Sequence, residues 1–194
     1  LEGSIFIAGA GVQWLRDKMK FIKKASETEK IVSSLKNNSG IYIVPAFTGI
    51  GAPYWNANAR GVLSGITRDT GPKEIIRATL ESVAYQTYDL FEAMRHDGLK
   101  PKLVKVDGGM VMNNWFSQFL SDVVNVKVLR PKVHETTALG AAFMAGLQIG
   151  VYKSLKDISY NWALDKKFSP KMKNKNRKTL LKGWFKAIKR TLIS

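Results

Sequence analysis

The sequence predicts an α/β protein, because short apolar runs and amphipathic helical runs alternate along it. From residue 61 onward, segments of strand character are followed by segments whose apolar residues recur every three or four positions. Such alternation is typical of parallel strands joined by helices. Two strand–helix units of the chain, one near its start and one in its second half, carry glycines between the strand and the helix, at residues 9–11 and 108–109.

The second glycine unit is the one around which the chain is arranged. Residues 103–106 favour a strand, Gly108 and Gly109 favour a tight turn, and Asn113 or Asn114 suits the N-cap of the following helix. Glycine has no Cβ and a helix start presents unpaired N–H groups, so this unit can bring bare backbone against a flat or anionic ligand. Tight packing at a strand end explains the glycine pair equally well.

The first glycine unit has the same layout. Residues 4–8 read as a buried strand, residues 9–11 as a turn, and residues 12–19 as a helix with one apolar face. Gln13 would lie in the first turn of that helix. Its amide either reaches a ligand held against the glycines or caps the local backbone, and the spacing alone does not separate the two.

Composition bounds the class of protein. With 194 residues and 45% hydrophobic content, the chain suits one domain with a real core. It has no cysteine, which excludes disulfides and thiolate metal sites, and its two histidines, His96 and His134, are far apart. No apolar run reaches the roughly 18 residues of a membrane span. The first residue is not Met and no basic leader precedes the first apolar run. We therefore expect a piece of a longer cytoplasmic protein, without membrane association.

The net charge of +16 is concentrated in the last segment. Residues 153–194 hold thirteen Lys or Arg against Asp157 and Asp165, a balance of +11. Such a tail can bind nucleic acid, anionic lipid or an acidic partner. Because it has no nucleic-acid motif, we favour a lysine-rich solvated surface and expect no nucleic-acid partner, with a polyanion-binding module as the alternative.

The segments between the two glycine units are predicted in the order helix, strand, strand and long helix, at residues 26–35, 41–44, 61–66 and 70–95. The long helix carries Glu81 in its apolar half. A buried carboxylate needs a partner, so we expect an ion pair with Arg77, one turn earlier.

The loop at residues 45–60 is predicted to be ordered. It contains Phe47, Tyr54 and Trp55, which need burial, so it is not a flexible linker. Either it is an aromatic plug over a sheet edge or it forms a wall of an active-site cleft.

The remaining segments are predicted as a strand, a helix of small residues capped by Thr136 or Thr137, and a docked amphipathic helix. The strand is at residues 126–129 and the small-residue helix, suited to close packing, is at 138–146. The apolar face of the last helix consists of Leu181, Trp184, Phe185, Ile188 and Leu192.

Together, these stretches resemble the glycerol kinases of the FGGY sugar-kinase family. The resemblance is carried by four sets of residues: 44–55 with Ala59-Arg60-Gly61, 77–86, 106–109 with Asn113-Asn114, and 137–142. It covers nearly the whole chain and weakens only in the tail. The segment at 44–61 is the most specific, because other sugar kinases of the family differ there.

This resemblance implies an α/β domain of the ribonuclease H-like, actin-like ATPase class, with a mixed sheet flanked by helices. It implies that residues 1–194 are a carboxyl-terminal kinase domain without its first strands and without the amino-terminal domain. The sheet would then have an exposed edge, which carries a risk of aggregation.

The family also implies the reaction of ATP with glycerol, giving sn-glycerol 3-phosphate and ADP, with Mg²⁺. Its nucleotide contacts match Gly9 and Gln13 in the first glycine unit and Gly109 and Asn113 in the second, and we place Gly108 in the same site. The catalytic aspartate and the glycerol ligands belong to the amino-terminal domain. We therefore expect no catalytic or metal-binding residue here, and no kinase activity and weak nucleotide affinity from the chain alone.

Several properties remain open at this stage. The full-length protein is expected to be a homo-oligomer, and the substrate could be another small polyol. Asn56-Ala57-Asn58 replaces the more usual acidic sequence of the family, which removes a charge role for that loop. The basic stretch at 170–177 replaces an acidic region that docks a regulatory phosphotransferase-system protein in some relatives, so that partner is not expected.

Overall fold

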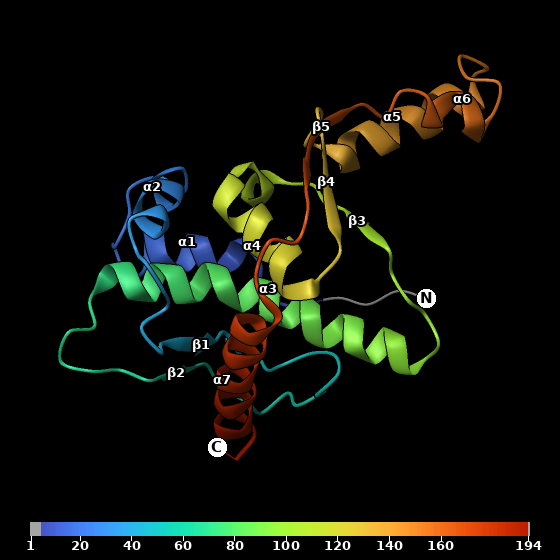
Figure 1. The fold of residues 1–194 in the computed structure, drawn as a ribbon. Helices are drawn as coiled ribbons and strands as arrows, with labels where there is room; N and C mark the ends of the chain where they lie inside the picture. Colours follow the sequence, from blue (N-terminus) through green and yellow to red (C-terminus); the bar gives the residue numbers. More distant parts are fainter. Residues whose placement is uncertain (1–4, 194) are drawn as a thin grey trace.

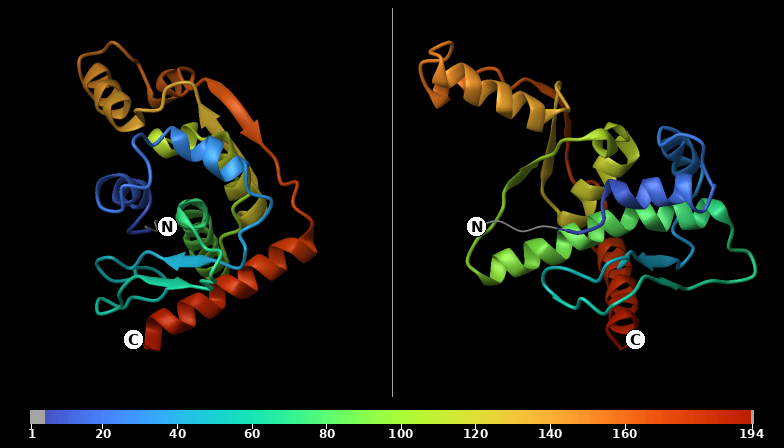
Figure 2. Two further views of the ribbon diagram at one scale, coloured as in Figure 1. Left: turned by 90° about the vertical axis from the view of Figure 1, so that its left-hand side faces the viewer. Right: turned by 180° about the vertical axis from the view of Figure 1, so that it is seen from behind.

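A long helix, α3 (Pro72–His96), runs through the middle of the computed structural model, which describes residues 5–193 (Figure 1). Helices α1 (Gly9–Asp17), α2 (Glu27–Ser33) and α4 (Asn114–Val124) pack along one side of it. The opposite side is covered by a two-stranded hairpin, with α7 (Asn174–Ile193) beyond it (Figure 2). No described helix is both long and apolar enough to cross a membrane.

The sequence predicted α3 closely because its signals are local. Glu74 accepts a hydrogen bond from the Gly71 N–H at 3.0 Å, and Pro72 occupies the first turn. The ten residues 76–85 are all buried, since α1, α2, α4 and one strand of the hairpin pack against this helix. The helix ends at Asp97 and Gly98, and Gly98 adopts φ +87°, which favours glycine.

The strands form two small sheets. In the first, β1 (Tyr42–Val44) pairs antiparallel with β2 (Val62–Ser64). In the second, β3 (Leu103–Lys105) pairs parallel with β4 (Lys127–Pro131), and β4 pairs antiparallel with β5 (Leu164–Phe168). The prediction of parallel pairing is confirmed for β3 and β4, which α4 connects. Within the described chain β3 and β5 are the edge strands of this sheet.

No pattern in the sequence indicates strand β5. Its residues Leu-Asp-Lys-Lys-Phe are polar except at the ends, and only Phe168 is buried. Position along the edge of β4, rather than residue type, makes this segment a strand.

The first predicted strand, at residues 4–8, is wrong for those of its residues that the structure describes. Ser4 lies outside the described residues, and residues 5–8 form no strand. A strand needs a neighbouring strand to receive its hydrogen bonds. Here the Ile7 carbonyl accepts instead from the Gln86 side chain of α3, at 3.3 Å. The helix that follows begins at Gly9, three residues earlier than predicted, and ends before Met19.

The aromatic loop at 45–60 is held by its own polar groups. The Asn56 side chain accepts hydrogen bonds from the backbone N–H groups of Asn58 and Ala59, at 2.9 and 3.0 Å. Phe47 lies against Trp14 of α1, with ring centroids 5.2 Å apart. The prediction that all three aromatics are buried is wrong for Trp55, which is 73% exposed.

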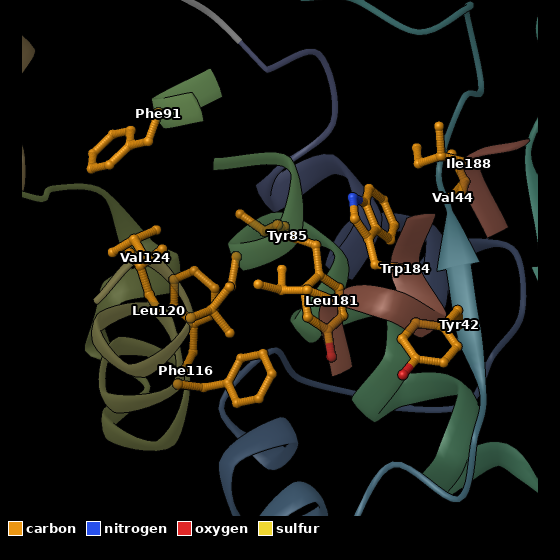
Figure 3. Packing of buried hydrophobic residues seen from close by; sticks show 14 of the residues in the cluster. Tyr42, Val44, Tyr85, Phe91, Phe116, Leu120, Val124, Leu181, Trp184 and Ile188 are labelled. Carbon is orange, nitrogen blue, oxygen red and sulfur yellow. The ribbon is translucent and has the colours of Figure 1, made fainter. Parts of the chain in front are cut away.

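The main core joins α3 to α7 through aromatic rings. Tyr85 stacks on Trp184 with centroids 5.3 Å apart, and Tyr42 lies beside them (Figure 3). Beneath the rings, Asp89 accepts hydrogen bonds from Trp184 Nε1 at 2.7 Å and from the Tyr54 hydroxyl at 3.0 Å. Burial raises the pKa of Asp89 to about 7, because the charged form has lost its water.

The last helix docks through most of the face that the sequence predicted. Leu181, Trp184 and Ile188 are buried, and Leu192 is half-buried. Phe185 is the exception: it is 40% exposed and makes an edge contact with Tyr88. Its position one residue beyond Trp184 turns it away from the line of buried residues.

Two helices project from this body. Helices α5 (Thr136–Gln148) and α6 (Leu155–Ser159) extend beyond β4 and β5 (Figures 1 and 2). The prediction that α5 packs closely against a sheet or a ligand loop is not met among the described residues, since only Gly146 of this helix is buried, against Tyr152. Apolar residues are exposed along the two helices and the turn between them: Met144, Ile149, Val151, Leu155 and Tyr160.

Replacing Gly183→Ala in α7 should destabilise the protein. An added Cβ there would overlap the Tyr42 ring, and such overpacking costs about 1–3 kcal/mol of unfolding free energy. Gly140→Ala in α5 is the matched control, because nothing lies within 4 Å of its added Cβ. Alanine is the better helix former, so the control should stabilise by up to ~1 kcal/mol. Chemical denaturation of both variants measures this, and equal effects would contradict the packing of α7 on β1.

Candidate functional site

The two glycine turns meet at one cavity of about 410 Å³. Gly9 and Gln13 of α1 line it from one side, and Gly109 and Asn113 line it from the other. This volume suits a small molecule, because ligand pockets occupy roughly 300–1,000 Å³. The remaining lining residues are Val12, Arg16, Ala25, Ser26, Thr28, Glu29, Leu80, Met110 and Met112.

Glycine leaves open space on both walls. Among residues 5–193, no heavy atom lies within 4 Å of the Cβ positions of Gly9 or Gly109, so a ligand can approach the backbone at either point. Gly108 does not line the cavity. It adopts φ +81° and its N–H donates to the His134 carbonyl at 3.0 Å, so it shapes the turn that presents Gly109.

Gln13 is free to contact a ligand. It lies on the exposed side of α1 and lines the cavity. Within residues 5–193, its amide makes no hydrogen bond with the protein, so the alternative of a local backbone cap is not observed. The side chain therefore keeps its full set of two donors and two acceptor lone pairs for another molecule.

The start of α4 is not an open anion site, contrary to the idea drawn from its sequence. Asn113 is the N-cap, and its Oδ1 accepts from the Phe116 N–H at 2.9 Å. The Glu29 carboxylate accepts from the Asn114 N–H at 3.2 Å and from its side-chain amide at 3.1 Å. A carboxylate thus already occupies the positive end of this helix. What Asn113 offers the cavity is its amide edge, not a free helix N-terminus.

No pattern in the sequence indicates that α2 forms the third wall of the cavity. Thr28 and Glu29 line the cavity and bond to the second glycine unit, 85 residues away in the chain. Their helix is short and polar in sequence, and a threonine in such a helix does not by itself indicate a structural or binding role. Only its burial, with 3% of Thr28 exposed, sets it apart.

Behind the cavity, the predicted pair of Arg77 and Glu81 is confirmed. Arg77 Nε lies 2.7 Å from Glu81 Oε1, and the Tyr85 hydroxyl donates to Oε2 at 2.9 Å. Burial raises the pKa of Glu81, while the Arg77 guanidinium acts against that rise. Arg77 also donates to the Leu35 carbonyl at 2.7 Å, and its guanidinium lies 5.1 Å from the centre of the Trp115 ring.

Two other candidate features lie apart from the cavity. The loop at 45–60 contributes no lining residue, so the suggestion that it forms a cleft wall is not met for this cavity. Over residues 5–193, no group of three or more His, Asp or Glu side chains is arranged to hold a metal ion.

The fold and the sequence place this chain among the sugar kinases. Residues 1–149 match the C-terminal domain of the FGGY family of carbohydrate kinases, and the chain belongs to that family. It has a TM-score of 0.77 with a xylulose kinase of Lactobacillus acidophilus at 23% identity, over 95% of this chain and 38% of the other, which is a likeness of fold. The predicted ribonuclease H-like, actin-like ATPase fold with a mixed sheet is confirmed.

The relatives of this chain include glycerol kinases. The chain is 55% identical to glycerol kinase 1 of Pseudomonas aeruginosa over 98% of its own length and 38% of that protein. It is 52% identical to the glycerol kinase of Clostridium botulinum, over 99% and 39%. The crystal structure of Plasmodium falciparum glycerol kinase with ADP matches with a TM-score of 0.87 at 40% identity, over 99% and 38%. The chain thus spans less than two fifths of the length of these relatives.

Replacing Arg77→Met should be strongly destabilising. Glu81 would be left as a buried carboxylate without its cation, and breaking such a pair costs about 3–5 kcal/mol. The double variant Arg77→Met with Glu81→Gln removes both charges and should recover part of the loss. Denaturant unfolding of the two variants tests this. A double variant no more stable than the single one would mean that the ion pair itself is not what stabilises this region.

Proposed function

We propose that this chain is the nucleotide-binding half of a glycerol kinase, which transfers the γ-phosphoryl group of ATP to glycerol. The products would be sn-glycerol 3-phosphate and ADP. The observation that carries the proposal is the single cavity lined by Gly9 and Gln13 together with Gly109 and Asn113. The 52–55% identity to glycerol kinases and the likeness to an ADP-bound glycerol kinase support it.

Each wall suits a different part of a nucleotide. Gly9 and Gly109 allow close approach of flat or charged groups to the backbone, and the amides of Gln13 and Asn113 can hydrogen-bond to a base or ribose. Among the remaining lining residues, Val12, Leu80 and Met110 supply apolar surface for a purine ring. Arg16 supplies a cation, already paired with Asp17 at 2.7 Å.

The lining does not suit a resident Mg²⁺. This ion prefers several oxygen ligands, commonly carboxylates together with phosphate oxygens and water. Among the lining residues in the part of the chain that the structure describes, Glu29 is the one carboxylate, and it is committed to Asn114. We therefore propose that Mg²⁺ enters with the phosphates of the nucleotide.

The glycerol site and the catalytic base belong, in this proposal, to the part of the relatives' length that this chain does not cover. Residues 1–194 would then be a carboxyl-terminal kinase domain without kinase activity of its own. Specificity for glycerol over another small polyol, the homo-oligomeric state and the cytoplasmic location stay predictions. The alternative of a polyanion-binding tail is weakened because α7 buries Leu181, Trp184 and Ile188 and so is a structural helix of the domain.

Calorimetric titration of the chain with ADP tests the site. Gln13→Ala and Asn113→Ala should each lower affinity by about tenfold, the loss of roughly one hydrogen bond to the ligand. Gln148→Ala, on an exposed residue of α5, is the matched control and should bind as the parent chain does. Binding should survive a rise in salt that would abolish polyanion binding.

The proposed nucleotide site fails if neither cavity variant alters ADP affinity, or if the parent chain binds no adenine nucleotide at millimolar concentration. Because Asn113 is also the N-cap of α4, its variant should lose about 1 kcal/mol of stability, so unfolding curves must accompany the titration. With glycerol and ATP, the chain alone should give no turnover in a coupled ADP-release assay.

A further inference from the structure

The hydroxyl of Thr28 lies in a hydrogen-bond chain with a fixed direction. It donates to the Ala25 carbonyl at 2.7 Å, which leaves its oxygen free to accept. That oxygen accepts from Asn113 Nδ2 at 3.2 Å. Since a carbonyl can only accept, the proton of Thr28 points to Ala25 and the direction of the chain cannot reverse.

The Asn113 amide is fixed at its other end as well. Its Oδ1 accepts from the Phe116 N–H at 2.9 Å, and a backbone N–H can only donate. A flipped amide would place its NH₂ group against that N–H and its oxygen against the Thr28 oxygen, whose proton is already donated to the Ala25 carbonyl. The N-cap contact therefore sets which end is oxygen, and Thr28 holds the nitrogen end.

Half of the Asn113 amide remains available. An amide has two N–H donors and two acceptor lone pairs, and the contacts to Thr28 and Phe116 use one of each. The residue is half-buried and lines the cavity, so one donor and one acceptor are left for a ligand. A 6-aminopurine offers the complementary acceptor and donor side by side, as in the pairing of Asn with adenine. A 6-oxopurine has an acceptor where the amino donor would be.

Thr28 is itself held in place without a ligand. It is 3% exposed, and its neighbour Glu29 bonds to both the N–H and the side-chain amide of Asn114. Two consecutive residues of α2 thus bond to two consecutive residues at the start of α4. This double contact fixes the distance between the helices, so the position of the Thr28 hydroxyl is set before any nucleotide enters.

We propose that Thr28 is a positioning residue for base selection: its hydroxyl holds the Asn113 amide so that the cavity prefers a 6-aminopurine nucleotide to a 6-oxopurine nucleotide. This inference rests on the proposed nucleotide site and adds to it a residue that does not itself contact the base.

The test compares ADP with inosine diphosphate, two nucleotides that differ at the 6-position and in the N1 proton. Their dissociation constants are measured by calorimetry for the parent chain, Thr28→Val and Thr28→Ser. Thr87→Val is the matched control, because the Thr87 hydroxyl also donates to a backbone carbonyl, that of Val83 at 2.7 Å, but lies outside the cavity. The ratio of the two dissociation constants is the readout, since loss of folded protein affects both ligands equally.

The parent chain should bind ADP about tenfold more tightly than inosine diphosphate, the lower end of the discrimination that a bidentate amide contact provides. Thr28→Val should bring the ratio close to one, chiefly by weakening ADP binding. Thr28→Ser keeps the hydroxyl and should retain the ratio, as should Thr87→Val.

Four outcomes would overturn the inference. Equal weakening of both nucleotides by Thr28→Val would mean that the residue only supports the fold, and the proposed nucleotide site would still stand. The inference would also fail, with the proposed nucleotide site still standing, if the parent chain bound both nucleotides equally. It would fail likewise if Thr28→Ser lost the preference for ADP as Thr28→Val does. A parent chain that binds neither nucleotide would instead overturn the proposed site, and this inference with it.

Discussion

The buried guanidinium of Arg77 is the contact on which the arrangement of the site depends. From α3 it reaches the Leu35 carbonyl just after α2 and the Glu81 carboxylate, both at 2.7 Å, and it lies over the Trp115 ring of α4. A buried cation is stable only when it is paired with an opposite charge and hydrogen-bonded. Satisfying Arg77 therefore brings α2 and α4 to defined places on one helix. The cavity forms where these two helices and α1 meet.

Because of this arrangement, the two glycine turns present different chemical groups to the cavity. At the start of α4, the Phe116 N–H donates to the Asn113 side chain and the Asn114 N–H donates to Glu29. These backbone groups therefore already have partners, and the bond to Glu29 holds α2 in place. The start of α1 has no side-chain cap and no acidic residue in its first turn, and Gly9 opens its backbone to the cavity. Two turns that look alike in the sequence therefore offer different chemistry, an amide edge on one side and open backbone on the other.

Sequence patterns predicted the elements that local contacts decide. The limits of α3 follow from Glu74, Pro72 and Gly98, all of which act within one turn of the helix end. Patterns failed where an element depends on a distant neighbour. The polar segment of β5 is a strand only because β4 lies beside it, while the apolar residues 5–8 are not a strand because no described strand flanks them. The exposure of Trp55 could not be predicted from sequence patterns for the same reason, because contacts made by other residues hold its loop in place.

The sequence by itself determined the family, the two glycine turns with Gln13 and Asn113 beside them, and the pairing of Arg77 with Glu81. These are features of short spacing, and residues four apart on a helix meet wherever that helix packs. Tertiary structure alone decided that both turns face one cavity and that Thr28 holds Asn113. A hydrogen bond between residues 85 positions apart depends on how α2 and α4 pack against α3, and no periodicity in either helix encodes that relation.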